Sequence, residues 1–430
     1  MTTQADAQDP LAGLGEINWS NLEHAYGSAE DIPPLVRKLK SSDKEDITSA
    51  YGVLYTSIFH QGSRYSASSA VVPFLYRLAI CPETLCRENI VRLLTRLAIG
   101  EPTHHWLRGI DVKGWREDVA TFQATGWCEE EKTRRLEWIN EGADEDDRKR
   151  RKLRSILFPS PEEIVKSSVA ELGVYDAVKD GLQHIIDLLN DDSVAIRQEA
   201  AYALAWFPEE LERIHPALFN LIDSETNPVV QATGLIALGQ LQTRSEGGID
   251  DTPVVRCLNS VFAQGRGSGL SRWASAIALI MLHVSQPEHV NEVLRKLKEN
   301  DYLQEYEPWN LEDVNFEFAD PDLASLATMS LRNLTRANSQ GSEMVIIEII
   351  PASRGETTLV LAEIGLKLVF ETPASEPLTP EGLIHDQREL IRALTKVDSF
   401  NWSFANFLSI LSGWALPTSL QKLKALVGEE

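Results

Sequence analysis

The sequence predicts an all-α protein, built as a solenoid in which helix pairs stack on one another. Residues 180–242 fall into two similar halves, each with an apolar helix pattern, a short polar turn and a second, alanine-rich helix pattern. The halves register when Ile196-Arg197 is aligned with Val230-Gln231, 34 residues further on, which is the length of a supersecondary unit. One such pair cannot cover its own apolar stripe, so we expect neighbouring pairs to stack and bury it.

The composition is that of an ordinary soluble chain, with 43% hydrophobic and 24% charged residues. Its 430 residues suffice for about ten helix pairs of ~40 residues each. The 64 acidic residues outnumber the 41 basic ones, which gives a net charge of −23. This charge argues against a nucleic-acid partner, because DNA- and RNA-binding proteins need clustered Lys and Arg to displace counter-ions.

The sequence favours a cytoplasmic protein without a membrane segment. The longest apolar run, residues 274–282, contains Ser275 and is too short to span a bilayer. The polar, acidic N-terminus is unlike a signal peptide. The four cysteines have no metal-binding or redox spacing, so we expect free thiols in a reducing cytosol, with a single disulfide as the alternative; they are Cys81, Cys86, Cys128 and Cys257.

The N-terminal part divides into a flexible tail, residues 1–17, and a region of helix pairs, residues 18–100. Apolar residues at helical spacing predict a first pair between residues 32 and 60 and a second between residues 69 and 99. The polar, glycine-containing segment from His60 to Tyr65 separates two helical runs and is therefore expected to be a loop.

Residues 101–160 break the period and form a non-repeat insertion. They contain four tryptophans, the adjacent His104 and His105, and a charged stretch from 144 to 154. In that stretch Asp144 stands four residues before Arg148, and Asp146 four before Arg150. Acid placed before base at this spacing favours a solvated, salt-bridged helix over a nucleic-acid-binding patch.

Repeats are expected over residues 161–340, followed by a helical C-terminal cap over 341–430. A third repeat is predicted from Val254 to Val284, and the acidic, aromatic segment 301–321 is expected to be irregular. Residues 344–370 are compatible with strand or helix, and the spacing of their apolar residues favours helix.

The repeated unit resembles the short bacterial type of HEAT repeat, which also occurs in phycobilin lyase subunits. The family pattern is a turn with Asp or Pro, then Val-Arg, a small-residue pair and Ala-Leu-Gly. The first copy reads Asp192, Ile196-Arg197, Ala200-Ala201, Ala203-Leu204; the second reads Pro228, Val230, Gly234, Ala237-Leu238-Gly239, with Gln231 in place of the arginine. The resemblance implies a HEAT/armadillo-like α-α superhelix whose concave surface holds a partner.

No strong catalytic motif is present: the sequence has no phosphate-binding loop, no HExxH and no GxSxG. The nine histidines are scattered apart from His104 and His105, so we expect no metal site and no cofactor. Three groups of residues are candidates for ligand or partner binding.

The first group is the loop that contains His60, Gln61, Arg64 and Tyr65. Its histidine could act as a general acid or base, or could bond the backbone ends of the flanking helices. The second group is Gln198, Tyr202 and Trp206, in the second helix of the first repeat. Tyr202 and Trp206 lie four residues apart on one helix face, where they either floor a groove or pack in the interior.

The third group comes from the insertion and contains His105 and Trp106, with His104 and Trp115 nearby in the sequence. Aromatic side chains at this density form either a small core or a ligand pocket.

Two functions fit these observations best, ahead of a third and narrower one, a chaperone-like lyase. The first is a non-catalytic binding module or regulator that holds a protein partner on its concave face, where an acidic groove would suit a basic partner. The alternative is an enzyme of the lyase, cyclase or hydrolase type, acting on a small molecule in an aromatic groove closed by the insertion.

Overall fold

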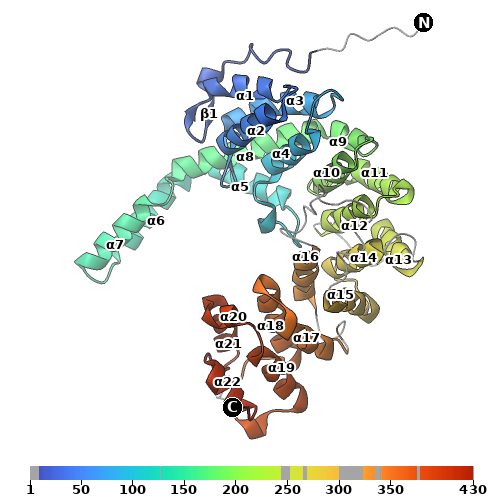
Figure 1. Ribbon diagram of the computed structural model, residues 1–430. Coiled ribbons are helices and arrows are strands. Elements are labelled where there is room, and N and C mark those ends of the chain that lie inside the picture. The colour runs from blue at the N-terminus through green and yellow to red at the C-terminus, as the bar shows by residue number, and fades with distance from the viewer. Residues whose placement is uncertain are drawn as a thin grey trace. The chain divides into compact units, whose positions relative to one another are not determined.

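The computed structural model describes residues 9–125, 127–243, 252–264, 269–299, 323–334, 339, 341–374 and 378–429. These residues are mostly helical (Figure 1), which confirms the all-α fold class. The chain divides into two compact units, with unit 1 ending at Glu210 and unit 2 beginning at Leu211. Residues 106–109 also belong to unit 2. The division falls between the two repeat copies found in the sequence.

Unit 1 is built around α3, α4, α8 and α10: α4 packs on the other three, and α3 also packs on α8. The helices of unit 1 are α1 Ile32–Lys38, α2 Lys44–Ile58, α3 Ser66–Ala79, α4 Arg87–Ile99, α5 Val112–Ala124, α6 Trp127–Asn140, α7 Glu145–Ile156, α8 Pro161–Asp180, α9 Leu182–Leu188 and α10 Val194–Leu204. In the expected tail, Leu14 is buried and its carbonyl accepts from Trp19 Nε1 at 2.8 Å. Residues 1–8 of that tail lie outside the described residues.

Helix α8 begins and ends for identifiable reasons. Ser160 and Glu163 form a capping box at its start, and Pro161 occupies its first turn, where no backbone donor is needed. Near its end, Tyr76 of α3 donates a hydrogen bond to the Val178 carbonyl at 2.6 Å. A Cβ at Gly181 would lie 2.2 Å from the Tyr76 ring, so only glycine fits where α8 ends.

The segment expected to be a loop is a short β-hairpin. Strand β3 (Phe59–His60) pairs antiparallel with β4 (Ser63–Arg64), and a second hairpin joins β1 (Glu23–His24) to β2 (Gly27–Ser28). Gln61 and Gly62 both have positive φ, at 51° and 86°. Two such residues make the tight turn that closes a two-residue hairpin, and this turn aims Arg64 away from solvent.

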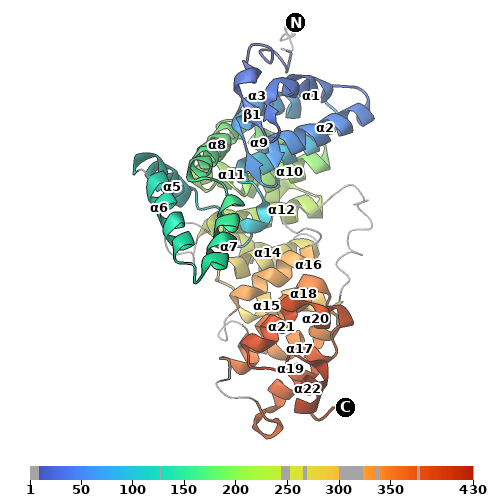
Figure 2. The same ribbon diagram turned by 90° about the vertical axis from the view of Figure 1, so that its left-hand side faces the viewer.

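Within the insertion, α5 and α6 pack on α8, and α7 packs on α6 (Figure 2). Helix α7 has no buried residue and carries ion pairs in its first two turns, in agreement with the predicted solvated, salt-bridged helix. The pairs differ from those expected: Glu145 pairs with Lys149 and Asp147 with Arg151, both at 3.1 Å. Asp144 is unavailable because it caps the helix, accepting from the Asp147 amide at 2.7 Å.

Unit 2 continues as helices that pack on their neighbours in sequence. They are α11 Leu211–Ser224, α12 Pro228–Gln242, α13 Pro253–Gln264, α14 Gly269–Met281, α15 Pro287–Glu299, α16 Leu323–Ser330, α17 Glu343–Ile349, α18 Gly355–Phe370, α19 His385–Thr395, α20 Ser399–Ser403, α21 Ala405–Gly413 and α22 Leu420–Leu426. The expected helix over 344–370 is confirmed as α17 and α18. The segment 301–321 lies outside the described residues.

Helices α12 and α14 approach each other closely. A Cβ on Gly239 would lie 2.8 Å from the Cβ of Ala278, so the contact needs a glycine on one helix and a small residue on the other. Helix α12 also packs on α11, and α14 on α13. Two helix pairs of unit 2 therefore meet through their second helices. Of the described helices, none is long and apolar enough to cross a membrane.

Candidate functional site

A cavity of about 350 Å³ in unit 1 gathers polar residues from four parts of the sequence. They come from the β3–β4 hairpin, the segment that follows α4, helix α5 and helix α8. We call it the Arg64 cavity; the polar and aromatic side chains that line it include Gln61, Arg64, Glu101, His104, His105, Trp115 and Glu171. Its volume lies at the lower end of the range for small-ligand sites.

Arg64 is the central residue of this cavity. Its side chain is 7% exposed, and Nη1 donates to the Gly62 carbonyl at 2.6 Å. The same nitrogen lies 3.6 Å from Oε1 of Glu171, and the guanidinium lies 5.8 Å from the centroid of the Trp115 ring. The buried Nε has no hydrogen-bond partner. Burial lowers the pKa of Arg64, but arginine keeps its charge at neutral pH, so a partly satisfied cation remains.

Gly100, directly after α4, makes room for this guanidinium. Its φ of +74° lies in the left-handed region, and a Cβ there would lie 2.5 Å from Arg64 Nη1. Glycine is therefore required both by the backbone conformation that ends α4 and by the position of the arginine.

Glu171 of α8 is the acidic group nearest to Arg64. Burial raises its pKa, against the opposing effects of the Arg64 charge, the Arg64 backbone amide and the Ser167 hydroxyl. Ser167 Oγ lies 3.5 Å from Glu171 Oε1. The carboxyl group therefore holds its proton to a higher pH than an ordinary glutamate does, and it compensates the arginine less as the pH falls.

The two adjacent histidines differ in environment. His105 Nε2 lies 2.9 Å from the Ile99 carbonyl, and because a carbonyl only accepts, this nitrogen carries the proton. His104 is exposed on the cavity rim. Glu101 pairs with Arg96 at 3.0 Å, so its charge is balanced outside the cavity.

The structure brings together part of the predicted candidate set. Gln61, Arg64 and His105 line the cavity. His60 does not line it; its Nδ1 lies 3.3 Å from the Tyr26 hydroxyl. Tyr65 caps the start of α3, and its pKa is raised by burial and by the charge of Glu171.

The second group lies in the interior, which is the packing alternative, but Trp206 is not on the helix as predicted: α10 ends at Leu204 and Trp206 lies in the turn after it. Tyr202 is 1% exposed, Trp206 is fully buried, and their rings meet edge to face with centroids 5.7 Å apart. Gln198 is buried as well, because α10 is covered on every side from Gln198 to Leu204. These side chains do not floor an open groove. Trp106 is also buried, and it belongs to unit 2 whereas His105 belongs to unit 1.

Glu171 was absent from the sequence candidates. It is one of 64 acidic residues and stands in a helix pattern without any motif, so no local signal distinguishes it. Only the packing of α8 against the β3–β4 hairpin brings it to Arg64.

The fold and this cavity define a mostly helical protein with a polar cavity in unit 1. All four cysteines are free thiols, as expected. Among the described residues, no group of three or more His, Cys, Asp or Glu is arranged to hold a metal ion. Comparison of the chain with protein-family models and with curated proteins finds no match.

Proposed function

We propose that the protein is a non-catalytic binding module, of HEAT-like organisation, that holds a protein partner by seating a carboxylate of that partner in the Arg64 cavity. The observation that carries this proposal is the buried Arg64 guanidinium, whose Nε is unpartnered. A carboxylate matches the planar guanidinium and can accept two hydrogen bonds from it. The close contact of α12 with α14 supports the HEAT-like organisation, since stacked repeats need small residues where their second helices meet.

The end of α7 favours a protein over a free small molecule as the ligand. Leu153, Ile156, Leu157 and Phe158 are between 63% and 78% exposed there. Single exposed apolar residues are ordinary, but a group of this kind marks an interaction surface. Lys152 and Arg154 stand among them and form no ion pair within the described part of the chain. The local charge thus suits a partner with acidic and apolar side chains, rather than the basic partner that the net charge suggests.

The test uses a fluorescein-labelled helical peptide with Glu on one face and Leu on the other, and a matched peptide with Gln in place of Glu. Fluorescence anisotropy should show binding of the Glu peptide to the wild-type protein. Arg64→Gln should weaken this binding by roughly tenfold or more, the effect of losing one charge-assisted pair.

Arg37→Gln, on the exposed face of α1, is the control and should leave the affinity unchanged. Circular dichroism melting of each variant establishes that the fold is retained. Equal binding of the Gln peptide, or an unchanged affinity of folded Arg64→Gln, would contradict the proposal.

The second candidate function is general acid–base catalysis on a small molecule in the same cavity. The raised pKa of Glu171 beside the Arg64 cation favours it, because catalytic carboxyl groups are tuned in this way. Incubation of the protein with a metabolite extract, followed by mass spectrometry, should then show a substrate consumed by the wild type and not by Glu171→Gln. A binding module consumes nothing in either case.

A further inference from the structure

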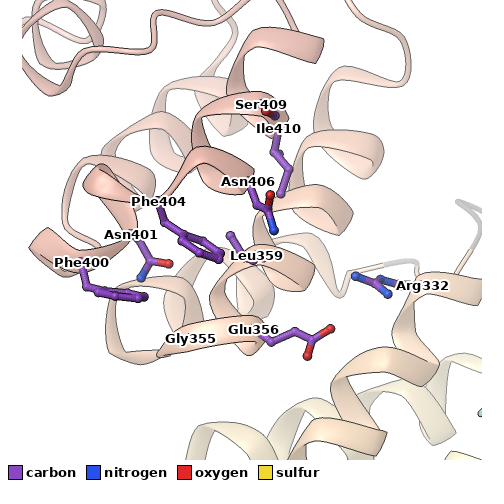
Figure 3. Close-up of a pocket in the computed structure, with 10 residues that line it drawn as sticks. All are labelled: Arg332, Gly355, Glu356, Leu359, Phe400, Asn401, Phe404, Asn406, Ser409 and Ile410. Atoms are coloured by element: carbon purple, nitrogen blue, oxygen red, sulfur yellow. The ribbon is translucent and has the colours of Figure 1, made fainter. Parts of the chain in front are cut away.

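Unit 2 contains a larger cavity, of about 700 Å³, which is independent of the Arg64 cavity. Figure 3 shows its walls: the first turns of α18, the short helix α20, and the segment from Phe404 into α21, with Arg332 at the far side. We call it the Phe400 cavity; the residues that define it here are Arg332, Glu356, Phe400, Asn401 and Phe404. The volume is that of a site for a small organic molecule.

Two aromatic rings form a platform in this cavity. Phe400 is 61% exposed and Phe404 37% exposed, and the rings stack with centroids 5.6 Å apart and planes 22° apart. Exposed phenylalanines leave much apolar surface in water, and a flat ring placed on them would cover it. The cavity therefore favours a planar ligand.

Asn401 places an unused hydrogen-bond acceptor in the wall. Its side chain is fully buried, and Nδ2 donates to Asp398 Oδ1 at 3.2 Å. The same Asp398 oxygen also accepts from the backbone N–H of Asn401 at 3.1 Å. A carboxylate only accepts, so this contact fixes the orientation of the asparagine amide. Its Oδ1 is then left buried without a partner, which is unfavourable and rare. A ligand with an N–H donor would satisfy it.

Oδ1 is buried from solvent, and Figure 3 draws the Asn401 side chain next to those of Phe400 and Phe404. A donor therefore reaches Oδ1 only after a movement of the cavity wall, and Phe400, which is 61% exposed, is the neighbouring wall residue least held by packing. The charged groups of the wall are Glu356 and Arg332, and Arg332 lies 3.7 Å from Glu363 outside the cavity. The wall therefore has no excess positive charge that would favour an anion.

The geometry points to a binding site for a neutral, planar heteroaromatic amine of the nucleobase type, which stacks on Phe400 and Phe404 and donates an amino N–H to Asn401 Oδ1. The stacking supplies most of the affinity, because every flat heterocycle has a face to offer. The hydrogen bond selects rings that carry a free amino group.

The test uses two pairs of probes in ligand-observed NMR titrations of the full chain. They are 9-methyladenine with its N6,N6-dimethyl derivative, and 1-methylcytosine with its N4,N4-dimethyl derivative. At least one amino compound should bind, and its dimethyl partner, which has no N–H donor, should bind roughly tenfold more weakly.

Phe400→Ala should weaken binding of the amino compound by about tenfold, whereas Ile384→Ala should not change it. Ile384 is the matched control because it is 60% exposed in unit 2 and does not line the cavity. Absence of binding by both amino compounds would overturn the inference, as would equal binding of the dimethyl derivatives. Unchanged binding in Phe400→Ala would place any bound ring elsewhere and would overturn it too.

Discussion

At the scale of single residues, Arg64 is constrained by the free-energy cost of burying a charged side chain. A buried cation is tolerated only when hydrogen bonds and an opposite charge replace the water it has lost. Here the Gly62 carbonyl, the Glu171 carboxylate and the Trp115 ring provide part of that replacement. The Nε of Arg64 has no hydrogen-bond partner, so this part of the lost hydration is not replaced. This is why we propose that the cavity binds a ligand.

The raised pKa of Glu171 should make the free energy of unfolding depend on pH. Its pKa is raised in the folded protein, so between the ordinary glutamate pKa and the raised value the folded state binds more protons than the unfolded state. The wild-type free energy of unfolding should therefore fall as the pH rises through this window, relative to Glu171→Gln. Urea denaturation of both proteins at several pH values from about 4 to neutral measures the difference.

Glu163→Gln is the control with the opposite sign. The backbone amide and hydroxyl of Ser160 lower the pKa of Glu163, so the wild type should gain stability relative to this variant as the pH rises through the ordinary glutamate range. The explanation of both shifts is wrong if the two variants show the same pH trend.

At the scale of elements, small residues decide how closely helices pack. Gly239 of α12 lies against Ala278 of α14, whereas Gly173 of α8 has nothing within 4 Å of the position of a Cβ. Both glycines lie inside helices, so intrinsic helix propensity alone would favour alanine at each by about 1 kcal/mol. Packing reverses that preference only at Gly239.

Gly239→Ala should therefore destabilise the protein by about 1–2 kcal/mol, because overpacking outweighs the gain in helix propensity. Gly173→Ala should instead stabilise it by about 0.5–1 kcal/mol. Chemical denaturation of both variants measures these changes. Stabilisation by Gly239→Ala would show that α12 and α14 lie further apart than the structure indicates.

Element prediction from the sequence was strong where a pattern is local. Apolar spacing located α2, α4, α12 and α18, and the capping residues explain where helices such as α8 begin. The β3–β4 hairpin was missed because its strands are only two residues long, too short to show an alternating pattern. The one local signal in the sequence was Gly62, because glycine readily adopts the positive φ that such a turn requires.

At the scale of the whole molecule, the chain forms two compact units, and the boundary after Glu210 falls between the two copies of the sequence repeat. Each unit has its own buried apolar core and its own cavity. Units with separate cores can unfold as separate cooperative blocks.

Differential scanning calorimetry should therefore show two transitions. Gly173→Ala, in unit 1, should raise one transition temperature, and Gly239→Ala, in unit 2, should lower the other. The comparison needs no knowledge of which unit melts first. A single transition that both variants shift would show that the units unfold together.

The candidate site was predicted in part. Gln61, Arg64 and His105 were named from polar residues near helix ends and from the histidine pair, and they do line one cavity. Tyr202 and Trp206 do meet, but α10 ends at Leu204, so Trp206 lies in the turn after the helix and not on its face. A helical pattern also does not tell whether a helix face meets solvent or other helices. Glu171 and Asn401 carried no motif at all.

The sequence by itself determined that this chain is helical, since the spacing of apolar residues and the turn residues between them act over a few positions along the backbone. It also predicts a repeated helix pair and an insertion that interrupts the repeats, and it places an arginine in a polar segment between two helices. Only the tertiary structure decided that Arg64 meets Glu171 in a cavity and that the Tyr202–Trp206 pair is interior. It also decided that Oδ1 of Asn401 is buried without a hydrogen-bond donor. Burial and pairing depend on segments far apart in the chain, and only packing brings those segments together.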